Sequence, residues 1–291
     1  ENDGTPFSGE NWDDREVGAS IAGVLSVAVG DLDNDGYLDI VSGSGSGENY
    51  EVIVWENDGS PFNSGWSPQD VGATADTDSV YAITVGDFDN DGNLDIASGS
   101  SGDNEIFVWQ NDGTPFSGYW TTSQSVGVST DTIWGLIAGD LDNDGYLDIV
   151  SGSTVNEDYE VIVWENDGSP FSGTWTPQDV GASLANVCEV AVGDLDNDGD
   201  LDIVSSSHSA EDYELIVWLN DGTPFSGYWT QQDVGASTAT MGYVTVGDLD
   251  NDGDLDIVSG SHTVATYELI VWENDGSPFS GTWNDNNVGA T

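Results

Sequence analysis

A nine-residue acidic pattern, Asp-x-Asp-x-Asp-Gly-x-x-Asp, occurs five times in this chain, beginning at Asp31, Asp87, Asp140, Asp194 and Asp248. The copies start 56, 53, 54 and 54 residues apart. Self-similarity at a fixed period of this size is typical of repeat architectures, in which each unit buries its apolar face against its neighbours. The chain is therefore expected to be one array of similar units, each carrying the same acidic loop.

The second repeat shows how one unit is built. Residues 80–85, 94–98 and 105–109 are rich in β-formers, and the turn signal Asn-Asp-Gly follows at 111–113. A weaker fourth strand lies between Trp120 and Gly127, and no segment has a capped helical period. Four short antiparallel strands in one repeat correspond to a propeller blade.

We therefore predict an all-β fold, a five-bladed β-propeller of four-stranded antiparallel blades with a surplus terminal strand. The chain is expected to form a single repeat domain, 1–291. Its expected parts are a terminal strand segment at 1–20 and repeats at about 21–73, 74–127, 128–181, 182–235 and 236–291.

The tryptophans support this interpretation. Five of them share one place in the third strand (Trp55, Trp109, Trp164, Trp218 and Trp272), and six share one place at the fourth (Trp12, Trp66, Trp120, Trp175, Trp229 and Trp283). Large aromatic faces that recur at blade period indicate packing between adjacent blades rather than a cofactor site.

Each acidic loop places four carboxylates within nine residues, and these repel one another unless a cation lies among them. Oxygen ligands at this spacing suit a hard divalent cation, and we expect about five Ca²⁺, one per repeat. An EF-hand needs flanking helices and a Glu at position 12, where this chain has Ser42 and its counterparts. The expected role is structural, because no open ligand position or partner group for catalysis is visible.

The run Val-Gly-Asp-Leu-Asp-Asn-Asp-Gly-x-Leu-Asp-Ile-Val-Ser at 29–42 and 192–205 resembles the FG-GAP/VCBS repeat family, which includes the integrin α-subunit propeller. The resemblance covers the whole chain and implies a propeller with calcium between the first and second strands. Longer family members close with seven blades, whereas this chain has five repeats. The seventh loop residue is implied to bind through its backbone carbonyl. The implied ligands are Asp31, Asp33, Asp35, Tyr37 and Asp39; Asp87, Asp89, Asp91, Asn93 and Asp95; Asp140, Asp142, Asp144, Tyr146 and Asp148; Asp194, Asp196, Asp198, Asp200 and Asp202; and Asp248, Asp250, Asp252, Asp254 and Asp256.

The formal charge of −54, with one Arg and no Lys, argues against nucleic acid and anionic membranes as partners. Five bound calcium ions would reduce that charge only to −44. Because cytosolic calcium is too scarce to fill weak oxygen sites, we expect an extracellular location, secreted or at the cell surface. No apolar run is long enough for membrane insertion. Cys188 has no Cys partner, and a packing role is expected for it.

The motif Asn-Asp-Gly-(Thr/Ser)-Pro-Phe occurs six times, once more than the acidic loop, so residues 1–18 duplicate 273–289 in role. A spare strand beside an exposed sheet edge favours strand addition between subunits. The alternative is that the chain was cut from a longer array out of phase with its blades.

Two connections differ between repeats, those before the first strand and those between the second and third strands. Four residues of these connections are expected near the central channel: Tyr81, Trp134, Met241 and Tyr243. They could form a stacking surface for sugars or a partner peptide, and the alternative is simple drift of unconstrained loops. His208 and His262 share one place in neighbouring repeats and are expected to be exposed loop residues.

The sequence offers no nucleophile–base pair and few His, Lys, Arg or Cys residues, so we expect no enzyme. The leading hypothesis is a calcium-stabilised extracellular propeller. It would act as a structural or adhesive interaction module that self-assembles into oligomers or filaments by terminal strand exchange. The alternative is a carbohydrate-binding lectin with repeated pockets between blades, and an extracellular protein or glycan is the expected partner in either case.

Overall fold

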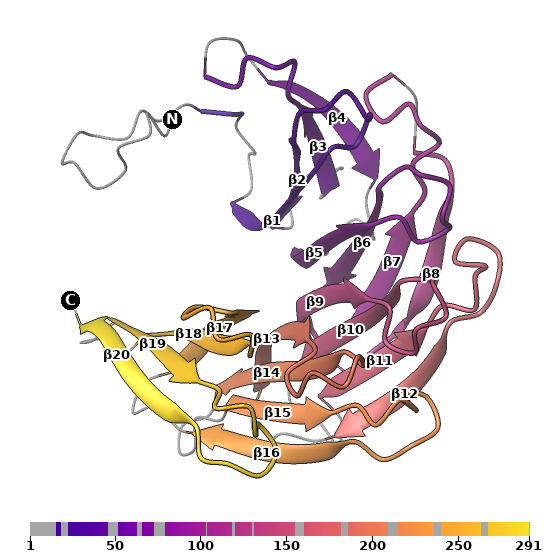
Figure 1. Cartoon of the computed structure of the whole chain (residues 1–291). Helices are drawn as coiled ribbons and strands as arrows, with labels where there is room; N and C mark the ends of the chain where they lie inside the picture. Colours follow the sequence, from indigo (N-terminus) through magenta and orange to yellow (C-terminus); the bar gives the residue numbers. More distant parts are fainter. Residues whose placement is uncertain are drawn as a thin grey trace.

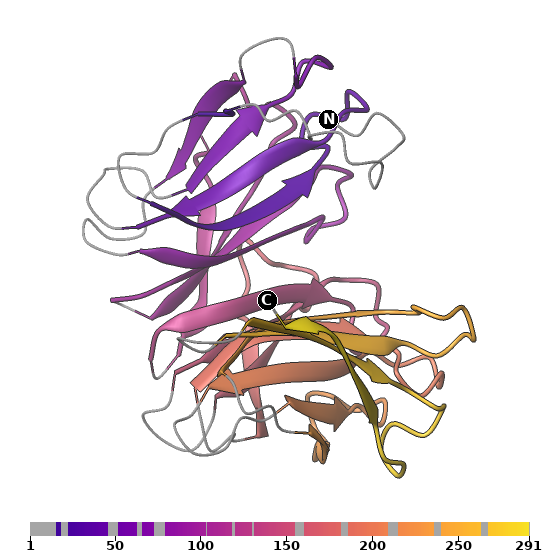
Figure 2. The ribbon, with the colours of Figure 1, turned by 90° about the vertical axis from the view of Figure 1, so that its left-hand side faces the viewer.

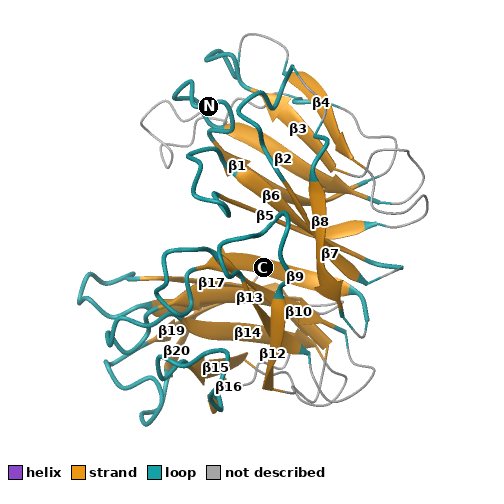
Figure 3. Ribbon diagram, turned by 90° about the vertical axis from the view of Figure 1, so that its right-hand side faces the viewer, coloured by secondary structure: helices purple, strands orange, loops and turns teal. Residues whose placement is uncertain are grey.

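The computed structural model describes residues 16–18, 23–45, 52–62, 66–72, 79–102, 104–117, 120–129, 131–154, 160–181, 186–208, 215–235, 240–262 and 267–290. These residues form twenty β-strands, and none of them is in a helix that could cross a membrane (Figure 3). The strands make five separate antiparallel sheets of four. The all-β fold with five four-stranded blades is therefore confirmed.

Each blade uses four strands that follow one another in chain order. Blade 1 contains β1 (Val24–Gly30), β2 (Asp39–Ser44), β3 (Val52–Glu56) and β4 (Ser67–Gly72); blade 2, β5 (Val80–Gly86), β6 (Asp95–Ser100), β7 (Glu105–Trp109) and β8 (Ser123–Val128); blade 3, β9 (Ile133–Gly139), β10 (Asp148–Ser153), β11 (Val161–Glu165) and β12 (Thr176–Gly181); blade 4, β13 (Asn186–Gly193), β14 (Asp202–His208), β15 (Leu215–Leu219) and β16 (Thr230–Gly235); and blade 5, β17 (Thr240–Gly247), β18 (Asp256–His262), β19 (Tyr267–Glu273) and β20 (Asn284–Ala290).

The five blades follow one another around an arc (Figure 1). Their first strands, β1, β5, β9, β13 and β17, lie on the concave side, and each of the first four contacts the first strand of the next blade. The fourth strands lie on the outside. The arc is open, because blade 1 and blade 5 stand apart at its two ends (Figures 1 and 2).

The hydrophobic core is divided among the junctions between blades. Buried side chains form four clusters, and each cluster joins residues of two successive blades. In the cluster between blades 2 and 3, for example, Phe88 and Ile106 of one blade pack with Ile149 and Trp164 of the next. A single four-stranded blade cannot bury both of its faces, so the stability of each blade depends on its neighbours.

One tryptophan anchors each junction, as the sequence predicts. The indole of Trp109 covers Gly72 of the preceding blade so closely that a Cβ on Gly72 would lie 2.4 Å from a ring carbon. The same pairing joins Trp164 to Gly127, and the indole N–H groups of Trp109 and Trp164 each donate 2.9 Å to a serine Oγ. Only glycine leaves room for the ring at this place.

The described part of the surplus strand occupies an equivalent position. Gly18 lies against the indole of Trp55, where an added Cβ would be 2.0 Å from the ring. Blade 5 is completed by β20, which pairs with β19 in the ordinary way. Residues 16–18 therefore stand where the fourth strand of a blade ahead of blade 1 would lie.

Candidate metal centres

Each acidic loop connects the first strand of a blade to the second, and its ninth residue begins the second strand. The loop is tightly wound, because its fourth and sixth residues both have left-handed backbone conformations. In blade 1 these residues are Asn34, with φ of 60°, and Gly36, with φ of 94°. Asparagine and glycine adopt this conformation at the least cost, which explains their presence in every copy.

Backbone amides hold the first carboxylate in place. The Asp31 carboxylate accepts hydrogen bonds from the N–H groups of Asp35 and Gly36, both at 3.0 Å. Asp33 Oδ1 accepts from Asp35 N–H at 3.2 Å. These bonds use up part of the acceptor capacity and fix the directions of the remaining oxygen lone pairs.

The ninth carboxylate is buried and connects two parts of the blade. In blade 2, Asp95 Oδ2 accepts from Phe88 N–H at 3.2 Å, and its Oδ1 accepts from Asn111 N–H at 2.8 Å. Asp39, Asp148, Asp202 and Asp256 make the equivalent pairs of bonds. The acidic loop is therefore held to the Asn-Asp-Gly turn that follows the third strand.

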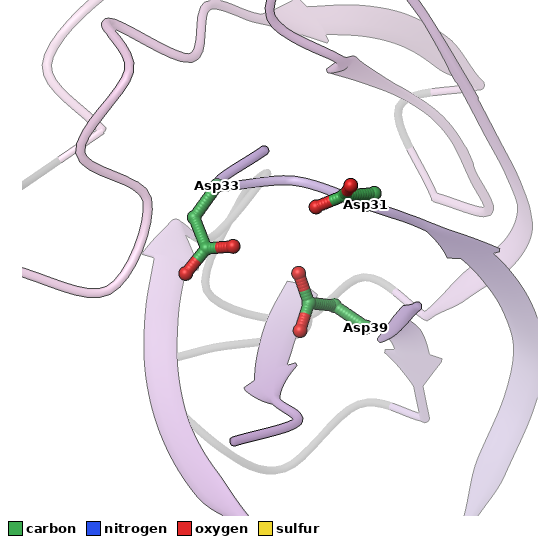
Figure 4. A group of neighbouring side chains, drawn as sticks. All are labelled: Asp31, Asp33 and Asp39. Atoms are coloured by element: carbon green, nitrogen blue, oxygen red, sulfur yellow. The ribbon is translucent and has the colours of Figure 1, made fainter. Parts of the chain in front are cut away.

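Three carboxylates converge in every loop, as Figure 4 shows for Asp31, Asp33 and Asp39. One oxygen from each lies within 4.8 Å of the other two. The equivalent groups are Asp87, Asp89 and Asp95; Asp140, Asp142 and Asp148; Asp194, Asp196 and Asp202; and Asp248, Asp250 and Asp256. The first, third and ninth positions of the predicted ligand set thus come together in all five blades.

The fifth and seventh positions lie outside these carboxylate groups. Asp35 Oδ1 accepts from Tyr37 N–H at 2.8 Å, within the loop itself. In blades 2, 4 and 5 the seventh side chain accepts a hydrogen bond across the junction with the preceding blade. Asp200 Oδ1 accepts from Asn143 Nδ2 of the preceding blade at 2.8 Å, and Asp254 accepts from Asn197 in the same way. Sequence reasoning missed this role, although the constant Asn at the fourth position was a signal for it.

The electrostatics of the loops are those of crowded, partly buried carboxylates. Burial raises the pKa of Asp39 to about 6, of Asp202 to about 7, and of Asp95 and Asp148 to about 8, and neighbouring carboxylates add to the effect. The pKa of Asp142 is also raised, first by burial and next by the charge of Asp144.

Two buried oxygens support the fit of a cation. Asp140 Oδ1 and Asp196 Oδ1 accept no hydrogen bond from the described residues. A purely carboxylate donor set is hard and anionic, which matches Ca²⁺ or Mg²⁺ rather than a thiophilic metal. The residues present therefore fit a hard divalent cation.

The structure also explains why the loop is no EF-hand. It runs from strand to strand, and the serine at position 12 is engaged elsewhere. Ser42 Oγ accepts the indole N–H of Trp55 at 2.8 Å, and the other four serines do the same at 2.9 Å.

The remaining candidates from the sequence fall into two groups. Cys188 is half-buried, and burial raises the pKa of its thiol to about 11, which disfavours the reactive thiolate. The backbones of His208 and His262 end the second strands of blades 4 and 5, whereas their side chains and that of Met241 lie outside the described residues. Most of the two variable connections also lies outside the described residues.

Five four-stranded blades, each with one acidic loop, define a β-propeller repeat protein. Family comparison matches the FG-GAP-like repeat to residues 31–98, 87–151 and 207–259, which is more than half of the chain. The chain belongs to the FG-GAP-like repeat family. A comparison with curated proteins gives no match.

Solved structures with similar folds include the one described as "Structure of Dos1 propeller", with a TM-score of 0.57 and 11% identity. The match covers 92% of this chain and 62% of that chain. The "Crystal structure of an active polycomb repressive complex 2 in the basal state" matches with a TM-score of 0.53 and 11% identity, over 92% of this chain and 52% of that one. At these identities the likeness shows the propeller fold alone.

Proposed function

We propose that this chain is a non-enzymatic, extracellular β-propeller module whose five acidic loops each hold one Ca²⁺. The observation that carries this proposal is the convergence of three carboxylates in every loop, and in blades 3 and 4 one buried oxygen, of Asp140 and of Asp196, accepts no hydrogen bond from the described residues. A calcium ion would supply the positive charge that these oxygens lack. The loop residues would contribute the first, third and ninth carboxylates and, as the family resemblance implies, the fifth side chain and the seventh carbonyl.

Bound calcium would stabilise the junctions as well as the loops. Asn90 Nδ2 donates 2.8 Å to the carbonyl oxygen of Gly145, so the loop of blade 2 is bonded directly to that of blade 3. A rigid loop holds such a donor in position, and binding free energy becomes folding free energy.

Calcium removal from the whole chain tests the proposal. Thermal unfolding followed by circular dichroism should show a midpoint that is higher in calcium than in excess chelator, and titration calorimetry should give about five sites per chain. Asp179→Asn, at an exposed position of β12 outside every loop, is the matched control and should respond like the parent chain. Equal midpoints with and without calcium would overturn the proposal.

We also propose an extracellular location, and the charge of the chain supports it. With calcium in all five loops the chain would still carry a formal charge of −44. Strong self-repulsion of this kind is best tolerated where salt or calcium is plentiful. Nucleic acid and anionic membrane surfaces are disfavoured as partners for the same reason.

Self-association is the interaction that the geometry favours, because the two ends of the arc are complementary. At each internal junction a leucine of one blade covers a glycine of the blade before it, as Leu94 covers Gly30. Leu38, the counterpart of Leu94 in blade 1, is 60% exposed, and Gly247, the counterpart of Gly30 in blade 5, has no atom near its Cβ position. The leucine surface of a junction is therefore uncovered at the blade 1 end of the arc, and the glycine surface is uncovered at the blade 5 end.

The exposed surfaces extend beyond this pair. Val27 and Val29 of β1 are 63% and 58% exposed, and Leu249 of blade 5 is 51% exposed, whereas its counterpart Leu195 is fully buried. Apolar faces of this kind mark interaction sites. Blade 1 of a second copy offers the side chains that the open face of blade 5 would accept. Residues 16–18 stand where the fourth strand of that blade would lie, so they would have to leave this place or replace β20 there.

Light scattering after size-exclusion chromatography tests self-association. The calcium-loaded chain should form concentration-dependent oligomers, and Gly247→Leu should weaken them by filling the glycine site. Asp179→Leu is the control, because it adds a leucine at an exposed position of β12 in blade 3, away from both ends of the arc. Removal of residues 1–18 tests whether the surplus strand takes part. A strictly monomeric parent chain at every concentration would contradict this part of the proposal.

The third-strand tryptophans at the junctions do not support the lectin alternative. The tryptophans there are buried: Trp109 is 6% exposed, Trp164 3% and Trp218 2%. Their rings face glycines of the neighbouring blade and leave no stacking surface for a sugar.

A further inference from the structure

The concave side of the arc contains a cavity of about 1100 Å³. Its wall is formed by the first strands of all five blades, which Figure 1 shows on the inside of the arc. None of the metal-loop carboxylates takes part in this wall. The cavity is thus separate from the candidate metal centres.

A β-bulge at one place in every first strand shapes this wall. In β5 the pairing with β6 passes from Val80 to Ala82 and leaves Tyr81 outside the ladder. The equivalent residues in the other blades are Leu25, Trp134, Cys188 and Gly242. All five line the cavity. A bulge re-aims a side chain away from the regular sheet, and bulges are common beside binding sites.

The bulge is also the place where the repeats differ most within their first strands. The bulged residue and the one after it read Leu-Ser, Tyr-Ala, Trp-Gly, Cys-Glu and Gly-Tyr in blades 1 to 5, whereas the following Asp-x-Asp-x-Asp-Gly loop is identical in all five. A common backbone feature thus presents five different groups to one cavity. This arrangement is asymmetric, as expected for a single ligand site.

Aromatic faces dominate one side of the wall. The rings of Tyr81 and Trp134 stack with their centroids 4.9 Å apart and their planes at 27°. Trp134 is 42% exposed, and Tyr243 across the cavity is 71% exposed. Exposed indole and phenol faces carry the negative end of the ring quadrupole.

An acidic residue, Glu189, lies in the cavity wall on β13, the strand next to that of Trp134. The backbone of Glu189 passes within 2.9 Å of the Cβ position of Gly135, the residue directly after Trp134. Glu189 is half-buried in the wall, and its Oε1 accepts only a long bond of 3.4 Å from Val190 N–H among the described residues. The chain has no Lys, and its single Arg, Arg15, lies outside the described residues, so none of them offers this carboxylate a basic partner.

We infer that this cavity binds an organic cation, an amine, guanidinium or quaternary ammonium group, with its charged group held by Glu189 and the aromatic faces of Tyr81 and Trp134. Aromatic faces combined with a carboxylate recognise such groups, and the attraction increases when water is excluded. The negative field of the chain raises the local concentration of cations and repels anionic ligands. The inference is independent of the calcium proposal, because the wall and the loops share no residue.

Titration calorimetry of the calcium-saturated full chain tests the inference directly. It is run at about pH 8, because burial raises the pKa of the Glu189 carboxyl to about 7 and the group must be ionised. Choline is the probe, and 3,3-dimethylbutanol, which has the same shape without the charge, is the matched ligand control. We expect choline to bind at one site and the neutral alcohol to bind at least about tenfold more weakly. About 0.5 M NaCl in every titration screens general attraction to the acidic surface. Equal binding of both ligands, or no binding of any cation, would overturn the inference.

Variants locate the site. Trp134→Ala and Glu189→Gln should each weaken choline binding by about tenfold. Tyr228→Ala is the control, because this tyrosine is 97% exposed outside the cavity and its loss should change nothing. If all three variants weaken choline binding equally while their thermal midpoints are unchanged, the cation binds elsewhere and the inference is wrong. The comparison of ligands on the parent chain remains decisive if a variant fails to fold.

A second arm distinguishes a free cation from one carried by a polypeptide. Acetyl-arginine amide and a short arginine-containing peptide are titrated beside choline under the same conditions. Tighter binding of the peptide indicates a protein partner, and equal or tighter binding of choline indicates a small molecule. A neutral disaccharide that binds and is not displaced by choline would instead make the cavity a sugar site and contradict the inference.

Discussion

Asn111 Nδ2 donates 2.8 Å to the carbonyl oxygen of Leu32, a residue 79 positions earlier in the preceding blade. Asn166, Asn220 and Asn274 repeat this bond at the next three junctions. The acceptor residue is the second of the acidic loop, so the bond joins the Asn-Asp-Gly turn of one blade to the metal loop of its neighbour.

The first prediction concerns this bond. Asn111→Ala should lower the free energy of unfolding by about 1–3 kcal/mol, because it leaves a buried carbonyl without a donor. Asn57→Ala is the control, since Asn57 occupies the same place in blade 1 and, among the described residues, its Nδ2 donates only to Leu38 within its own blade. Chemical denaturation should show a smaller loss for Asn57→Ala. Equal losses would mean that the contact between blades contributes nothing measurable.

The second prediction concerns the tryptophan–glycine contact. Gly127→Ala should destabilise the chain by about 1–3 kcal/mol, because the new methyl group would lie 2.1 Å from an indole carbon of Trp164 unless the blades separate. Gly242→Ala is the control, since its Cβ position has no neighbour within 4 Å. Denaturation midpoints that shift equally for both would show that the junction adapts freely.

The third prediction distinguishes metal binding from simple structural damage. Asp142→Asn keeps the oxygen that accepts from Asp144 N–H and removes one charge from the group. Without calcium, the variant should unfold at the same temperature as the parent or higher, because repulsion is relieved. With calcium, it should be less stable than the parent, and calorimetry should find one site fewer. A loss of the same size in both conditions would indicate a purely structural aspartate.

The fourth prediction concerns pH. The pKa values of Asp95 and Asp148 are raised from 3.8 to about 8 in the folded, metal-free chain, so folding favours their protonated forms. Below about pH 4 both folded and unfolded chains are protonated at these sites and no penalty exists. As pH rises from about 4 to about 8, the folded chain must ionise these buried carboxylates, which costs free energy that the unfolded chain does not lose. The free energy of unfolding of the metal-free chain should therefore fall between about pH 4 and pH 8.

Calcium should reverse this trend, because it binds the ionised carboxylates and competes with protons. The difference in thermal midpoint between calcium and chelator should therefore grow from pH 5 to pH 8. Thermal unfolding at several pH values checks both statements. A difference that shrinks as pH rises would contradict the assignment of these carboxylates as ligands.

Much of this architecture could be predicted from the sequence because its signals are local. The five copies of the acidic pattern define the period, and Gly36 and its equivalents predict a tight loop. The alternation of β-formers with Asn-Asp-Gly turns predicts four strands per blade, which β5 to β8 confirm. The recurring tryptophans predict junction packing, which the contact of Trp109 with Gly72 confirms.

The remaining features depend on distances between residues that are far apart in the chain. No local pattern identifies Leu32 as the partner of Asn111, or Asp200 as that of Asn143. The β-bulge at Tyr81 and Trp134 leaves no turn signal in the sequence, because the extra residue is accommodated only when a second strand pairs beside it.

The sequence by itself thus determined the repeat, the blade and the acidic loop, since hydrogen bonding and side-chain spacing within about 54 residues specify them. Only the tertiary structure decided that the arc stays open, with Leu38 exposed at one end and Gly247 uncovered at the other, and that five different bulged residues share one cavity. The physical reason is that the angle between blades arises from packing at each junction, and its sum over five blades is a property of the whole chain.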